Sequence, residues 1–168
     1  MKFSELFTSK DNIQLDKKTL VILRWLANIG QLASISIVYI ILNFKFAFFY
    51  CLMIILFGAA TNFYLQFIVK ENQLSNIKSS SYLLYDLFQL ALLLFLTGGV
   101  TNPFIILLII PEITSSTFLT LKSTLNLTII TIVILIVLTL NHYPLPHSGD
   151  LHFHVPNYYL YAVPISII

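Results

Sequence analysis

A polar break at residues 98–104 separates two long apolar runs and carries side chains suited to ligand binding. The adjacent glycines Gly98 and Gly99 let a backbone approach a ligand or another helix closely. The amide of Asn102 both donates and accepts hydrogen bonds, and Phe104 adds a flat apolar face. Pro103 is suited to start a helix. These residues predict either a seat for a small flat ligand with carbonyl oxygens or a tight helix–helix turn.

Two acids, Asp86 and Glu112, lie inside apolar segments, where a charged side chain is costly. Such residues normally face the interior of a helix bundle and are candidates for a polar or proton-transfer role. Gln89, three residues after Asp86, shares its helix face. A plainer interpretation is also open, in which Asp86 is an interfacial acid and Glu112 binds a neighbouring helix.

The composition indicates an integral membrane protein. Of 168 residues, 58% are hydrophobic and only 10% are charged, whereas soluble domains carry about 25% charged residues. The net charge of +2 gives no indication of a nucleic-acid partner, so membrane lipid is the expected surrounding. A single cysteine, Cys51, excludes an intrachain disulfide.

Apolar segments predict an all-α, multi-pass bundle of six transmembrane helices, following a tail at residues 1–19. The transmembrane domain spans residues 20–168. Its helices are expected at about 20–42, 46–69, 81–97, 103–121, 124–140 and 157–168. The last segment ends at Ile168, well below spanning length, so we expect the sequence to be a fragment of a longer protein.

Basic residues predict that the N-terminus is cytoplasmic, by the positive-inside rule. The opposite side of the membrane holds only Lys45, which places residues 98–104 on the periplasmic side. Arg24 is expected to snorkel to the cytoplasmic surface. The residues assigned to the cytoplasmic side are Lys2, Lys10, Lys17, Lys18, Arg24, Lys70, Lys78 and Lys122.

Histidines cluster in the polar segment 141–157, together with Asp150. Histidine pairs bind zinc or copper in many proteins, but this spacing matches no established ligand pattern. We therefore predict no metal site and interpret the segment as a solvated loop with pH-sensitive charge. The four histidines are His142, His147, His152 and His154.

With these residues in view, the chain resembles the membrane domain of RegB/PrrB-type sensor histidine kinases, which are redox-responsive. The hallmark of that family is Gly-Gly-x-x-Asn-Pro-Phe in the second periplasmic loop, and residues 98–104 match it in full. The run Leu23-Arg24-Trp25-Leu26 resembles the family's first helix. Asp86-Leu87 with Gln89-Leu90 resembles its third.

The resemblance implies that the motif contacts ubiquinone, with its glycine N–H groups and the Asn102 amide bonding the carbonyls and Phe104 stacking on the ring. The implied quinone-binding residues are Gly98, Gly99, Asn102, Pro103 and Phe104. It also implies a bacterial inner-membrane location, a homodimer and a cognate response regulator. The ATP-binding kinase core and its phosphoacceptor histidine would lie beyond Ile168, so this segment is expected to hold no catalytic residue.

Two other functions remain open from the sequence. Asp86 and Glu112 on a polar path would suit a small transporter or permease subunit. A respiratory-complex assembly subunit is a third possibility.

Overall fold

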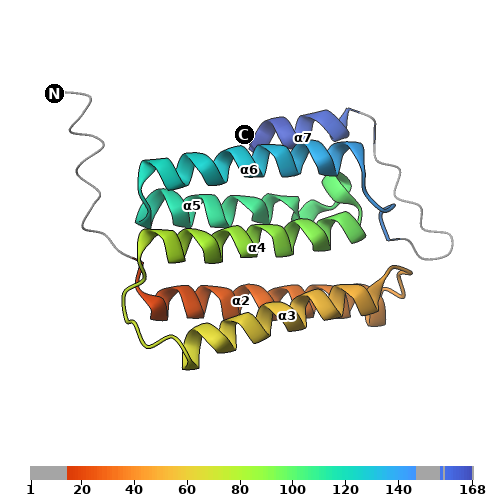
Figure 1. Ribbon diagram of the computed structural model, residues 1–168. Coiled ribbons are helices and arrows are strands. Elements are labelled where there is room, and N and C mark those ends of the chain that lie inside the picture. Colours follow the sequence, from red (N-terminus) through yellow and green to blue (C-terminus); the bar gives the residue numbers. More distant parts are fainter. Residues whose placement is uncertain (1–14, 147–155, 157, 168) are drawn as a thin grey trace.

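The computed structural model describes residues 15–146, 156 and 158–167, and in this part the chain is helical throughout apart from its connections. Figure 1 shows the long helices lying side by side, with α2 and α3 on one side of α4 and with α5, α6 and α7 on the other. The helices are α2 (Lys17–Ser36), η1 (Ile37–Ile41), α3 (Phe48–Phe67), α4 (Asn76–Leu96), η2 (Gly99–Thr101), η3 (Pro103–Leu108), α5 (Ile109–Phe118), α6 (Leu121–Leu140) and α7 (Tyr159–Ile167).

Four of these helical stretches are long and apolar enough to cross a membrane, which confirms the predicted helical membrane fold in its coarse form. They are Lys17–Ile41, Phe48–Phe67, Asn76–Leu96 and Leu121–Leu140. A fifth apolar stretch, Pro103–Phe118, is shorter, and α7 is nine residues long in the described part of the chain. In a bilayer core, helices satisfy their backbone hydrogen bonds internally, and this accounts for the all-helical architecture.

The third helix begins earlier than the sequence pattern predicted. The prediction started it at residue 81, whereas α4 starts at Asn76 after the N-cap residue Ser75, whose hydroxyl accepts a hydrogen bond from the Lys78 N–H. The Asn76 side chain also donates to Ser123 and accepts from the Thr120 N–H. A polar segment therefore folds into the helix because its side chains cap one helix and bind the start of another.

The segment predicted as one helix over 103–121 divides into two. Residues Pro103–Leu108 form a 3-10 helix, and the α-helix runs only over Ile109–Phe118. Pro111 has no N–H to donate to the Leu107 carbonyl, and its ring crowds that carbonyl in an α-helix, so the tighter helix precedes it. The α-helix ends at Phe118, after which the backbone of Leu119 is extended.

The packed interior is divided among three groups of buried side chains. One joins α4 to α6 and the two 3-10 helices around Leu87, Leu94 and Leu135. A second lies around Leu20, Leu65 and Leu127, and a third, smaller group surrounds Cys51. Helix α2 packs against α3, and α3 packs against α4. This arrangement positions the polar faces of α2 and α4 toward each other.

Candidate functional site

A cavity of about 840 Å³ lies between α2 and α4 and extends to the turn that follows α4. This volume falls within the range of about 300–1,000 Å³ typical of small-ligand pockets. Leucine side chains such as Leu23, Leu90 and Leu107 make most of its wall apolar. Its polar lining consists of Arg24, Asn28, Gln31, Ser34, Asp86, Gln89, Thr97, Thr101, Asn102 and Thr114.

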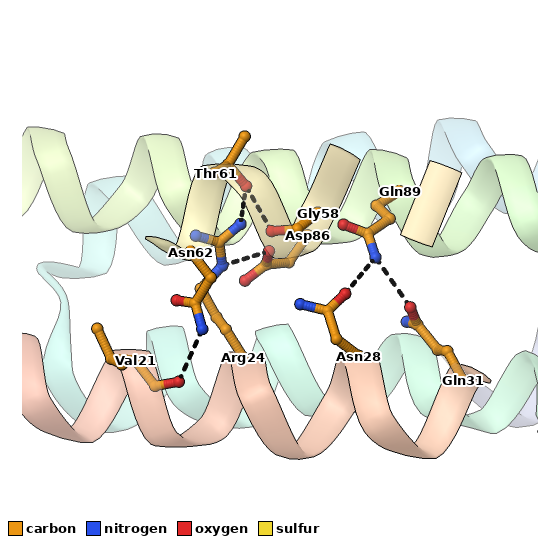
Figure 2. A network of polar contacts seen from close by, with 9 residues as sticks. All are labelled: Val21, Arg24, Asn28, Gln31, Gly58, Thr61, Asn62, Asp86 and Gln89. Carbon is orange, nitrogen blue, oxygen red and sulfur yellow. Dashed lines mark hydrogen bonds and ion pairs between the residues drawn. The ribbon is translucent and has the colours of Figure 1, made fainter. Parts of the chain in front are cut away.

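A polar stripe on α2 faces two polar side chains on α4 inside this cavity. Figure 2 shows the contacts: the Gln89 amide nitrogen donates to the Asn28 side-chain oxygen and to the Gln31 side-chain oxygen, both at 2.9 Å. One turn away, Arg24 Nε donates to Asp86 Oδ1 at 2.8 Å. The five side chains form two adjacent interhelical contacts, which hold α2 against α4.

The Arg24 guanidinium is the most buried charge of this network, with 3% of the residue exposed. Besides Asp86 it donates to the Thr61 hydroxyl of α3 at 2.8 Å, while its Nη1 atom is buried and has no hydrogen-bond partner among the residues that the structure describes. The rings of Tyr82 and Tyr85 lie 5.2 and 5.4 Å from the guanidinium carbon. The expectation that Arg24 snorkels to the surface was therefore wrong, because the helix bundle supplies an anion and two aromatic faces that neutralise it internally.

Gly58 on α3 makes room for the Gln89 amide. A Cβ atom at this glycine would lie 2.1 Å from Gln89 Oε1 and 2.6 Å from its amide nitrogen. The absent side chain lets the amide lie against the α3 backbone while it bonds to α2. Three helices therefore determine the position of this one side chain.

The Gly-Gly motif forms a compact turn at the far end of the cavity. Gly98 and Gly99 both have positive φ angles, of 118° and 54°, which glycine adopts without steric cost. A Cβ at Gly98 would lie 2.6 Å from Leu145 Cδ1, and one at Gly99 would lie 2.5 Å from His142 Cγ. Both glycines are thus required by the backbone conformation and by close packing against the segment after α6.

The amide of Asn102 is fully engaged inside this turn. Its nitrogen donates to the Thr97 carbonyl at 3.1 Å and to the Thr97 hydroxyl at 2.7 Å, and its oxygen accepts from the Phe104 N–H at 2.9 Å. Asn102, Pro103 and Phe104 line the cavity, whereas the two glycines are not among its lining residues. The motif therefore reaches the cavity through Thr101 and its last three residues, and Phe104 is 43% exposed.

Glu112 lies apart from the cavity and from Asp86. Its carboxylate oxygens accept hydrogen bonds from Thr128 at 2.9 Å and from Thr131 at 2.5 Å, both on α6. Asp86 and Gln89 come together with the α2 stripe, and Glu112 connects α5 to α6. The structure thus separates the two acids that the sequence analysis grouped.

The histidine-rich segment is only partly described. His142 is the described member, and its Nδ1 atom lies 2.8 Å from the Leu138 carbonyl oxygen. His147, His152, His154 and Asp150 lie outside the described residues. Within the described ranges, no group of three metal-ligating side chains forms.

The α2 stripe of Arg24, Asn28 and Gln31 was missed as a unit in the sequence analysis. Its members lie at positions i, i+4 and i+7, the spacing of one helix face. Asp86 and Gln89 have the matching i, i+3 spacing on their own helix. Looking for polar residues at helical spacing inside each apolar segment would have found both faces.

Fold and site together define a helical membrane protein with a ligand-sized cavity bordered by α2, α4 and the segments that follow α4. The chain is homologous to the sensor histidine kinase RegB of Cereibacter sphaeroides, with 33% identity over 152 residues, or 90% of this chain. This similarity confirms the resemblance drawn from the motif. The chain spans about a third of RegB's length (33%). No family model and no solved structure matches the chain.

Replacing Gly98 with alanine tests the turn geometry. We expect Gly98→Ala to lower the stability of the purified protein by about 1–3 kcal/mol, because a residue with a Cβ is strained at this positive φ. Thermal unfolding in detergent is the measurement. The matched control is Gly30→Ala, since a Cβ at Gly30 meets nothing within 4 Å. Equal melting temperatures for the two variants would contradict the turn described above.

Breaking the Arg24–Asp86 pair tests the buried contact. We expect Arg24→Met to destabilise the protein by up to about 3–5 kcal/mol, because it leaves the partly buried Asp86 carboxylate, 25% exposed, without its cation. The double variant Arg24→Met/Asp86→Leu is expected to be more stable than Arg24→Met alone. Denaturant titration followed by circular dichroism measures both.

The exposed pair Lys78–Glu71 serves as the control for this experiment, with side chains 49% and 52% exposed. Lys78→Met is expected to change stability by at most about 1 kcal/mol. An Arg24→Met effect as small as that of Lys78→Met would show that Arg24 is not held in a buried ion pair.

Proposed function

We propose that this chain is the membrane input domain of a RegB-like sensor histidine kinase that reads the redox state of the quinone pool. The main support is that one cavity is lined both by residues 101–104 of the Gly-Gly-x-x-Asn-Pro-Phe motif and by the polar side chains that α2 and α4 direct toward each other. Homology to RegB over 90% of the chain supports the same assignment.

The chemistry of the cavity suits a quinone in particular. Its leucine-rich wall matches an isoprenoid tail, and Phe104 offers an aromatic face. Its polar lining includes the side-chain amides of Asn28 and Gln31, which carry donors for carbonyl oxygens, and Gln89, whose nitrogen orients those two amides. Asn102 contributes by fixing the turn, since its own amide is already engaged. The glycines contribute by letting that turn pack closely.

Signalling would follow from unequal binding to two states of the bundle. A ligand shifts an equilibrium only as far as its affinities for the two states differ. Oxidised and reduced quinone differ in hydrogen-bonding sense, because a carbonyl accepts where a hydroxyl also donates. We propose that this difference alters the α2–α4 contact within a homodimer and reaches an ATP-dependent kinase core and its response regulator.

We further propose six membrane spans in the full domain, a cytoplasmic N-terminus and a location in the bacterial inner membrane. Figure 1 places the starts of α2, α4 and α6 at one end of the bundle and the motif turn at the other. Lys17, Lys78 and Lys122 lie at or near those starts, as the positive-inside rule expects of a cytoplasmic end. Arg24 no longer counts toward this asymmetry because it is paired inside the bundle.

Ubiquinone-1 binding to the purified chain tests the quinone proposal. Trp25 is the only tryptophan, so quenching of its fluorescence reports a bound quinone. We expect Phe104→Ala to weaken binding by about threefold to tenfold through loss of an aromatic contact. Asn102→Ala is also expected to weaken binding, because it releases the turn that carries Phe104.

Phe88→Ala is the matched control for Phe104→Ala. Phe88 is 49% exposed on α4 and is not among the cavity-lining residues. It is expected to bind ubiquinone-1 as the wild type does. Unchanged binding in both Phe104→Ala and Asn102→Ala would remove the motif from the quinone site.

Cysteine labelling in intact cells tests the orientation. In a Cys51→Ala background, we expect Lys45→Cys to react with a membrane-impermeant maleimide from outside and Glu71→Cys to react only after lysis. Both positions are exposed, in connections at opposite ends of α3. The reverse pattern would place the N-terminus and the motif on the sides opposite to those proposed.

A further inference from the structure

Resting on the function proposed above, we infer that the polar head of the ligand binds at the amide cluster between α2 and α4, and not at the Gly-Gly motif. The amide cluster consists of Asn28, Gln31 and Gln89, which line the same cavity as the motif residues. The ligand class is a neutral head with carbonyl oxygens and an apolar tail. The motif turn shapes the other end of the cavity and contacts the apolar part of the ligand.

The two ends of the cavity are too far apart for one ring to bind at both. Gln89 and Thr97 are on α4 and at its C-cap, eight positions apart, which corresponds to about 12 Å along a helix that rises 1.5 Å per residue. Asn102 is hydrogen-bonded to Thr97, so it is fixed at the far end. A single six-membered ring reaches one group of polar side chains or the other.

The available donors lie at the amide cluster. Both donor positions of the Asn102 amide are taken by Thr97, and its oxygen is taken by Phe104. At the cluster, Gln89 donates to the side-chain oxygens of Asn28 and Gln31, which orients the amide nitrogens of those two residues away from that contact. Among the described hydrogen bonds, neither nitrogen has an acceptor, and a carbonyl oxygen would supply one.

The charge balance of the neighbouring pair selects a neutral head. Arg24 is already bonded to Asp86, so the net charge beside the amide cluster is close to zero. An anionic head would meet the Asp86 carboxylate in a low-dielectric interior, where like charges repel strongly. A carbonyl oxygen needs only donors and brings no charge. The cluster therefore favours a quinone-like head over a carboxylate or phosphate.

Gly58 provides a way to displace the cluster without removing any of its polar groups. A Cβ there would overlap the end of the Gln89 side chain, at 2.1 Å from Oε1 and 2.6 Å from Nε2. Gln89 is long and flexible, so its amide can move while the backbones of α3 and α4 stay in place. Gly58→Ala should then misplace the Gln89 donor that aligns Asn28 and Gln31.

The test measures ubiquinone-1 affinity by Trp25 quenching in the purified full chain. We expect Gln31→Leu and Gly58→Ala each to weaken binding by about tenfold, the effect of losing one or two well-placed hydrogen bonds. The controls are Gln73→Leu, at an exposed position outside the cavity, and Leu56→Ala, at an exposed position on α3 that does not line the cavity. Melting curves of all four variants identify any loss of folding.

The outcomes separate this inference from the function on which it rests. Tenfold weaker binding in Gln31→Leu and Gly58→Ala, with both controls like the wild type, supports the amide cluster as the head site. Wild-type affinity in folded Gln31→Leu and Gly58→Ala, together with loss of binding in Phe104→Ala, overturns the inference and leaves the proposed function standing. Failure of the wild type to bind ubiquinone-1 overturns both.

Discussion

Hydrocarbon offers no hydrogen bonds, so a guanidinium inside a membrane helix bundle must find all its partners within the protein. Arg24 meets most of this requirement through Asp86 on α4, Thr61 on α3 and the faces of two tyrosine rings, and among the described residues only its Nη1 atom lacks a hydrogen-bond partner. The cost of burying either charge alone is several kcal/mol, so each ion fixes the position of the other. The mutual orientation of α2, α3 and α4 depends on this contact.

The same constraint explains why a polar cavity exists beside it. Asn28, Gln31 and Gln89 continue the polar faces of α2 and α4 beyond the ion pair, and each amide must be satisfied by another amide or by a ligand. These amides line an apolar-walled cavity that has donors at one side and the motif turn at its end.

Much of the fold was predictable from the sequence, because the apolar core of a bilayer requires long apolar helices. Apolar length identified the four long helices, and the glycines, asparagine and proline of residues 98–104 identified a turn. The start of α4 at Asn76 was not predictable, since its side chain bonds to Thr120 and Ser123, far away in sequence. Nor could the local sequence pattern tell whether Arg24 pairs with Asp86 or reaches the membrane surface, because the answer depends on which helix packs against α2. The sequence identified the motif residues, but only the three-dimensional packing shows that Phe104 lines the cavity and that the two glycines do not.

Photolabelling with an azido-ubiquinone, followed by mass spectrometry of the modified peptides, tests the central claim that the quinone lies between α2 and α4. The account predicts modification of cavity-lining positions on these helices, around Gln31 on α2 and Leu93 on α4, and its loss when unlabelled ubiquinone is in excess. Competable labelling confined to α3 or α6, with α2 and α4 unmodified, would contradict it.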